Sequence, residues 1–201
     1  MFVCAGARQH LRTFGRTIAL VALFALSAPT VHATTFLPVT FDDLIAQSDV
    51  IFVGEVADVH PFTLQTREGT IVKTRVTFRV TDPLSGDQSI VQVLDFLGGE
   101  ADGIGLRISG MPTFTVGDRR IVFARHDQSI NPIVGFTQGL MRVAPDTSGV
   151  DRVQTLEGTP ILQPESIGSV LSIQRAPMTP MRLADFRDRV KQAWAAKGAG
   201  R

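Results

Sequence analysis

The stretch IVKTRVTFRVT, residues 71–81, decides the fold class because its apolar and polar residues alternate with a period of two. One face would carry Val72, Thr74, Val76, Phe78 and Val80, and the other Lys73, Arg75, Thr77, Arg79 and Thr81. Successive side chains of an extended strand point to opposite faces of the sheet. The pattern therefore predicts an antiparallel strand with one buried face and one face in water.

Further strand candidates flank this stretch, separated by short segments with turn chemistry. VIFVGEVADV (50–59) is rich in β-branched residues; Gly54 suggests a bulge or bend, and Pro61 is expected to end the strand. The downstream candidates are 89–97, 105–109, 119–126, 134–144 and 151–156, the last two joined by the hairpin signal PDTSGV. This series predicts a mainly β domain, an antiparallel barrel or sandwich of six or seven strands.

Two helices are expected outside the strands. Thr40, followed three residues later by Asp43, is a candidate N-cap for a short helix over one end of the sheet. At the other end of the chain, Thr179 and Pro180 are expected to start an amphipathic helix. Its apolar residues recur at helical spacing, and they are Leu183, Phe186, Val190 and Trp194. We expect Trp194 to dock on the predicted barrel; a partner-binding helix is the alternative.

The amino terminus resembles a secretory signal peptide. Three arginines precede the apolar run 17–28, and VHA (31–33) offers small residues at a cleavage spacing. We therefore expect a signal peptide over 1–33, a β-barrel domain over 34–156, and a connection with the terminal helix over 157–201. The chain would be secreted or periplasmic, with no stable membrane span after cleavage. An amino-terminal membrane anchor is the alternative, although Pro29 interrupts the run.

Composition limits the function classes of the predicted mature chain. Residues 1–33 hold three arginines and no acid, so 17 basic and 19 acidic residues remain, for a net charge of −2. Such a balance argues against a nucleic-acid partner, which would require a basic stripe. The only cysteine, Cys4, lies within the predicted signal peptide, so the mature domain would contain neither a disulfide nor a thiolate site.

The glycine-rich stretch 97–120 resembles a ligand loop but lacks the spacing of one. Neither G-x-x-x-x-G-K-[ST] nor G-x-G-x-x-G is present, so a phosphate cradle is not indicated. Glu100 and Asp102 occur once, without the repetition of calcium-binding arrays. We interpret the stretch as turns at one end of the barrel and keep both acids as candidate binding residues; a calcium site there is left open.

No catalytic or metal motif is recognised in the chain. His60 and His126 are the only histidines after residue 33, and neither H-E-x-x-H nor G-x-S-x-G occurs. A triad of Ser109, His126 and an aspartate can be imagined, but nothing in the spacing supports it. The sequence therefore predicts a protein that is not an enzyme and has no cofactor, and apart from the calcium site left open at the glycine-rich stretch it predicts no metal site.

The order of three segments resembles the netrin-like module shared by tissue inhibitors of metalloproteinases and complement C-terminal domains. The matching pieces are Ser48 to Val56, Phe78 to Gly86 and Phe114 to Phe123, within about residues 41–144. The resemblance implies an OB-like antiparallel barrel of about six strands, with a short helix before the first strand. The chain is also similar to a group of uncharacterised exported bacterial proteins with SGMP-x-F, VGF-x-QG and a terminal helix.

The inhibitors of that family use an amino-terminal cysteine to chelate the zinc of a protease, and this chain departs from them. The mature chain would begin Thr34-Thr35-Phe36. A weaker form of the mechanism is a hypothesis, in which these three residues enter a protease cleft as an extended strand. Unchanged inhibition after their replacement would exclude it.

The favoured function is therefore an exported, non-enzymatic binding module that recognises a protein or an envelope component. Its binding loops are expected among residues 61–70 and 98–113 at one end of the barrel. Two other functions stay open: a small exported hydrolase whose site forms only in the fold, and a purely structural role.

Overall fold

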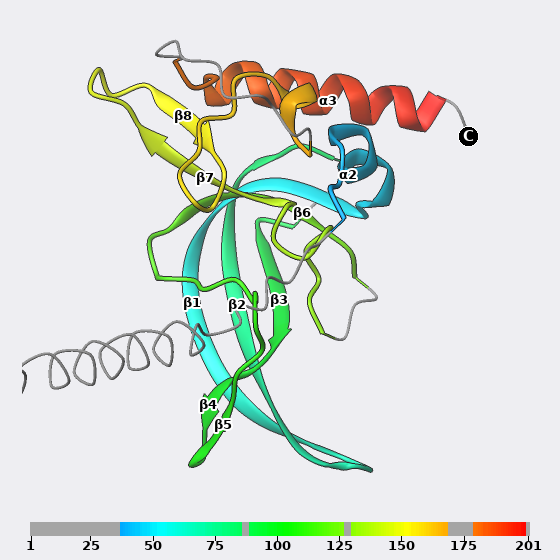
Figure 1. Ribbon diagram of the computed structural model, residues 1–201, viewed down its shortest axis with the longest axis vertical. Coiled ribbons are helices and arrows are strands. Elements are labelled where there is room, and N and C mark those ends of the chain that lie inside the picture. The colour runs from blue at the N-terminus through cyan, green and yellow to red at the C-terminus, as the bar shows by residue number, and fades with distance from the viewer. Residues whose placement is uncertain (1–36, 86–88, 127–129, 169–178, 200–201) are drawn as a thin grey trace, which may run out of the picture. The chain divides into compact units, whose positions relative to one another are not determined.

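The computed structural model describes residues 37–85, 89–126, 130–168 and 179–199. The three hypothesised inhibitory residues, Thr34, Thr35 and Phe36, and the predicted signal peptide lie outside this part of the chain. The helical elements are α2 (Phe41–Gln47), the 3-10 turn η1 (Pro164–Ser166) and α3 (Leu183–Ala199) (Figure 1). The strands are β1 (Val50–Thr66), β2 (Gly69–Pro83), β3 (Val91–Leu97), β4 (Gly99–Ala101), β5 (Ile104–Leu106), β6 (Arg119–Ala124), β7 (Leu140–Pro145) and β8 (Asp151–Gln154). The described chain is therefore mainly β, as the sequence predicted.

Six strands form one antiparallel sheet in the order β3-β2-β1-β6-β7-β8. β1 is central because residues 50–55 pair with β6 on one side while residues 52–66 pair with β2 on the other. β3 and β8 are the two edges, and strand pairing within the described residues does not close the sheet into a barrel. β4 and β5 form a separate two-stranded sheet.

The predicted bend at Gly54 is confirmed as a shift in register between β1 and β2 at Val53 and Gly54. A Cβ on Gly54 would lie 2.9 Å from Cε2 of Phe52 and 3.2 Å from the carbonyl oxygen of Arg79. The absent side chain therefore lets the Phe52 ring lie against the bent strand. A second irregularity follows between Val56 and Asp58, and such bulges increase the twist of a strand.

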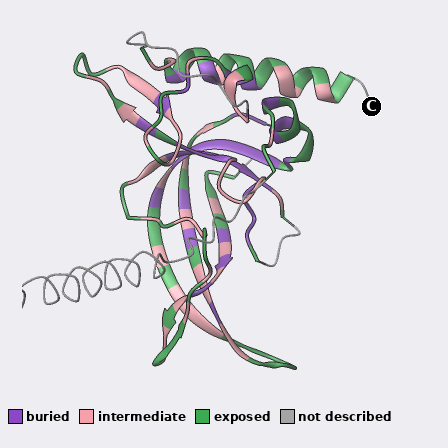
Figure 2. Ribbon diagram, viewed as in Figure 1, coloured by how far each residue is buried: buried purple, intermediate pink, exposed green. Residues whose placement is uncertain are grey.

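The sheet buries apolar side chains on both of its faces. Figure 2 marks the buried residues along its strands in purple. On one face, Ile51, Val53, Ile121 and Phe123 pack with residues of both helices. On the other, a cluster includes Phe52, Val76, Phe78, Leu94, Phe96 and Val122. β1 and β6 contribute to both clusters because their successive side chains point to opposite faces.

Both α-helices cover the first face. α2 begins with the predicted capping box, in which Thr40 and Asp43 satisfy each other's backbone N–H groups. Phe41 of α2 meets Phe186 of α3 edge to face, with ring centroids 6.2 Å apart. Trp194 is half-buried against the same cluster, which confirms its predicted docking. α3 is thus part of the core.

Several predicted boundaries are wrong. Pro61 does not end β1, which continues to Thr66; beyond Glu55 only one side of the strand is paired within the six-stranded sheet, and an edge tolerates proline. β7 begins at Leu140 and not at residue 134, because Gly135 and Phe136 both have positive φ and form a turn. β3, β5, β6 and β8 are each shorter than the strand predicted for them.

The terminal helix starts at Leu183, later than the predicted start at Thr179 and Pro180. The backbone just before the helix is extended and hydrogen-bonded to β8 and to the segment that follows β8. The N–H of Met181 donates to the carbonyl oxygen of Ile161, and the carbonyl oxygen of Met181 accepts from the N–H of Val153. These backbone bonds exclude helical pairing at Met181. The helix therefore begins only after the chain has left β8.

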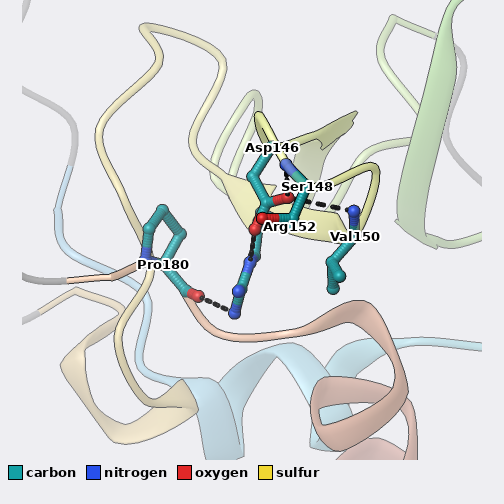
Figure 3. Close-up of polar contacts among 5 residues, drawn as sticks. All are labelled: Asp146, Ser148, Val150, Arg152 and Pro180. Carbon is teal, nitrogen blue, oxygen red and sulfur yellow. Dashed lines mark hydrogen bonds and ion pairs between the residues drawn. The ribbon is translucent and has the colours of Figure 1, made fainter.

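The predicted hairpin between β7 and β8 is confirmed, and Asp146 organises it (Figure 3). One carboxylate oxygen of Asp146 accepts from the backbone N–H groups of Ser148 (2.8 Å) and Val150 (3.0 Å), and the other from Nε of Arg152 (2.8 Å). Nη1 of Arg152 donates to the carbonyl oxygen of Pro180 at 3.0 Å. The hydrogen bond from Arg152, together with those from the backbone, lowers the pKa of Asp146.

Candidate binding groove

A groove of about 860 Å³ lies where the glycine-rich stretch crosses the sheet. Its walls come from the end of β3, the β4–β5 hairpin and the segment 107–114, with β1 and β2 contributing one residue each. The lining residues are Val59, Thr74, Phe96, Leu97, Gly98, Gly99, Glu100, Gly105, Leu106, Arg107, Ile108, Ser109, Gly110, Met111, Pro112, Thr113 and Phe114. The loop predicted as 98–113 therefore does border a concave surface.

Two glycines bring this segment close to β2. Oγ1 of Thr74 donates to the carbonyl oxygen of Gly98 at 2.7 Å, and the Gly98 N–H donates to Val72 at 2.8 Å. A Cβ on Gly99 would lie only 2.5 Å from Oγ1 of Thr74, and the φ of +129° at Gly99 is one that L-residues rarely adopt. Glycine is therefore required here for close contact with the sheet.

The β4–β5 hairpin runs along the lower parts of β1 and β2 as drawn in Figure 1. Its turn contains Asp102 and Gly103, with φ of 52° and 76°. Oγ1 of Thr63 in β1 donates to Oδ2 of Asp102 at 2.7 Å. Asp102 thus has a structural contact that fixes the hairpin tip, whereas Glu100 lines the groove.

The far wall of the groove is anchored by Phe114. Its ring lies 4.8 Å from that of Phe96 and 5.8 Å from that of Phe78, measured between centroids. Met111 packs against the same cluster. Aromatic pairs of this kind contribute about 0.5–1.5 kcal/mol beyond their burial. The segment 107–114 is therefore attached to the sheet by apolar contacts.

Hydrogen bonds within this segment are few. Met111 donates to Ile108 at 3.3 Å, whereas the backbone N–H groups of Ser109, Gly110, Thr113 and Phe114 have no partner among the described residues. Glu100 and Arg107 form no ion pair in the same part of the chain. The groove thus combines apolar walls with free backbone donors and one free charge of each sign.

The structure does not connect the residues of the imagined triad. Ser109 lines the groove, while His126 follows β6 and its backbone N–H donates to Asp49 at 3.0 Å. His60 lies on β1 opposite Arg75. No hydrogen bond joins Ser109 to His126 in the described ranges, and no group of three or more His, Cys, Asp or Glu residues there could hold a metal ion.

A second concavity, of about 430 Å³, was not anticipated from the sequence. It lies between the start of β7 and the connection that follows β8, and its lining includes Thr137, Gln138, Leu140, Leu156 and Ile167. The Gln138 amide is already occupied, since its oxygen accepts from Val39 and its nitrogen donates to Leu37 and Gly135. No local motif marks this pocket, because it is assembled from separate turns.

Among the described helices, none is long and apolar enough for a membrane span. Comparison with protein families, curated proteins and solved structures found no match to this chain. The function must therefore be inferred from the geometry of the chain itself.

Proposed function

We propose that this chain is an exported, non-enzymatic binding module that holds an extended segment of a partner protein in the groove beside residues 107–114. One observation carries the proposal: the backbone donors of this segment are unpaired where they border a groove with apolar walls. An extended polypeptide supplies carbonyl acceptors along its backbone and side chains for apolar pockets, which is the basis of strand-like peptide recognition.

The two free charges at the groove favour a partner segment that carries charge of both signs. Glu100 and Arg107 are both exposed. A rim charge of this kind mainly affects the association rate and the choice of partner, while the buried apolar contacts supply affinity. We therefore assign the apolar walls formed with Met111 and Phe114 to affinity and the two charges to selectivity.

The proposal includes a fold assignment. The bent antiparallel sheet, the capped helix before β1 and the turn-rich crossing after β3 support a netrin-like, OB-type architecture. Export is supported by the sequence features of residues 1–33. The alternative, a small exported hydrolase, has no arrangement of described residues that favours it.

A substitution that fills the groove tests the proposal. Gly105 lines the groove, and a Cβ there would have no atom within 4 Å, so Gly105→Trp should fold normally and obstruct the groove. Gly198, on α3 and away from the groove lining, also has open space around it, so Gly198→Trp is the matched control. The probe is a display library of random ten-residue peptides.

We expect the full chain and the Gly198→Trp variant to select the same peptides, and Gly105→Trp to weaken their binding at least about tenfold, or about 1.4 kcal/mol. Equal binding by all three proteins would contradict the groove assignment. A library without any enriched peptide would contradict recognition of extended segments.

A further inference from the structure

The edge strand β3, together with the residue before it, exposes three large apolar side chains. Ile90, Val91 and Val93 have 80%, 44% and 48% of their surface exposed. β3 ends the six-stranded sheet, and among the described residues its only strand partner is β2. Proteins usually protect such edges with charges, proline or a covering element, because unpaired backbone groups together with apolar residues attract another strand.

The free backbone groups of β3 can be identified from its hydrogen bonds. The carbonyl oxygen of Ile90 accepts from Val80 of β2, whereas the N–H of Leu97 points away from β2 and donates to Ile130. Backbone groups of alternate residues point to opposite sides of a strand in an antiparallel ladder. The N–H and C=O groups of Val91, Val93 and Asp95 therefore point away from β2, toward the free edge. The N–H of Val91 also donates to Oγ of Ser89 at 3.3 Å, so pairing at Val91 would replace this long local hydrogen bond.

We propose that this edge pairs antiparallel with β3 of a second copy of the chain, which sets Val91 opposite Val93 of the second copy. By two-fold symmetry, Val93 then faces Val91 of the second copy, and Ser89 and Asp95 face each other. Gln92 meets its own counterpart at the symmetry axis. The contact is isologous, since the same surface is used by both copies.

Charge and the position of Leu97 select this register. Asp95 carries the only charge on β3; it is paired with Arg75 at 2.8 Å and would face the neutral Ser89. Shifting the register by two residues in one direction sets Asp95 opposite Val91 and Leu97 opposite Ser89. That pairing would use the N–H of Leu97, which is already bonded to Ile130. The opposite shift sets Val93 against Ser89, so that only Val91 of each copy still faces a valine, instead of both Val91 and Val93.

The size of the contact predicts a dimer that depends on concentration. A single strand pair lies at the low end of specific interfaces, below about 1,200 Å² of total buried surface, where association is weak or transient. We therefore expect monomer at low micromolar concentration and an increasing fraction of dimer toward the millimolar range.

Crosslinking of single-cysteine variants tests the register. The variants use the full-length chain with Cys4→Ser, so that the introduced thiol is the only one. In the proposed dimer the two Gln92 residues form a non-hydrogen-bonded pair, whose Cα atoms lie about 4.5 Å apart and permit a disulfide. Val116→Cys, at a site that is 62% exposed and away from β3, measures collisional crosslinking.

We expect Gln92→Cys to crosslink at least about tenfold faster than Val116→Cys under mild oxidation. Equal rates would overturn the proposal, as would a monomer at all concentrations in sedimentation of the unmodified chain. If the chain does not dimerise at any concentration but binds an unrelated extended peptide along β3, the edge serves another partner and the dimer proposal is wrong.

Proline at the edge supplies an independent test. The N–H of Val93 points away from β2, so Val93→Pro should keep the ladder with β2 and weaken dimerisation at least about tenfold. Gln92→Pro removes an N–H directed at β2 and should instead lower the melting temperature. An unchanged dimer in a folded Val93→Pro variant would overturn the proposal. If Val93→Pro does not fold, the crosslinking rate of Gln92→Cys alone tests the proposal.

Discussion

Arg119 at the start of β6 and Asp151 at the start of β8 form a bidentate ion pair, with N–O distances of 2.7 and 2.8 Å. β7 lies between these two strands in the sheet order, so the pair ties strands that share no backbone hydrogen bonds. The hydrogen bond from Arg119 lowers the pKa of Asp151 and raises that of Arg119. The negative charge of Asp151 is therefore stabilised in the folded state.

This pair predicts acid sensitivity. A carboxyl group whose pKa is lower in the folded state than in the unfolded state stabilises the fold at pH values above its unfolded pKa, which is near 3.9 for aspartate. This stabilisation is lost as the pH falls through the pKa of the folded state. Asp151→Asn should therefore cost up to about 1 kcal/mol at pH 7, because the pair is partly exposed. The difference from the unmodified chain should disappear at the most acidic pH, in urea unfolding measured from pH 2 to 7.

Asp58→Asn is the control for this experiment, since Asp58 is exposed on β1 and makes no ion pair among the described residues. Its unfolding free energy should follow that of the unmodified chain. A constant difference between Asp151→Asn and the unmodified chain across the whole pH range would contradict the electrostatic explanation and indicate a packing defect.

Gly99→Ala should destabilise the protein by about 1–3 kcal/mol, because alanine at this φ is strained and its Cβ would meet Oγ1 of Thr74. Gly105→Ala, six residues later on the same hairpin, has open space and no positive φ and should differ by less than about 0.5 kcal/mol. Chemical unfolding of both variants measures the contrast. Equal stability would show that the β4–β5 hairpin can shift away from β2 without cost.

Lys197 joins the two helices by donating to the carbonyl oxygens of Ile45 and Ser48, each at 2.9 Å, near the carboxyl end of α2. A positive charge is favoured at that end of a helix. Lys197→Met keeps most of the side-chain volume and should cost about 1 kcal/mol in thermal or urea unfolding. Lys191→Met removes an exposed charge from the same helix, one that is paired with Asp82 at 3.2 Å and also lies near the Arg187–Asp82 pair. It should cost less, because Arg187 still pairs with Asp82; the reverse order would contradict the capping role.

Local sequence patterns correctly predicted the elements that depend on interactions between residues close together in the chain. The alternation at 71–81 lies within β2, where Val72, Val76 and Phe78 are buried and Arg75 and Arg79 are exposed. The capping box of Thr40 formed for the same reason, since all of its atoms lie within one turn of chain. Such features depend little on the rest of the fold.

Tertiary pairing decided the features that sequence could not give. Pro61 was expected to end a strand, but the tolerance of an edge for proline depends on which strands lie beside it. The candidate groove shows the same limit: Glu100 was identified as a loop residue, whereas the contacts of Phe114 with Phe78 and Phe96 join residues far apart in the chain. A single sequence does not reveal that separation in space.

The last prediction concerns α3, whose apolar face closes the core. Phe186 is fully buried, so Phe186→Ala should cost about 3–5 kcal/mol through lost contacts and the cavity left behind. Ala195→Ser, on the exposed side of the same helix, should change stability by less than about 0.5 kcal/mol.

Trp194 is the only tryptophan in the chain, so its fluorescence reports the docking of α3 directly. If the unfolding midpoint from Trp194 falls well below that from far-ultraviolet circular dichroism, the helix detaches before the sheet unfolds. Coincident midpoints, both lowered by Phe186→Ala, are the expected result for a helix that belongs to the core.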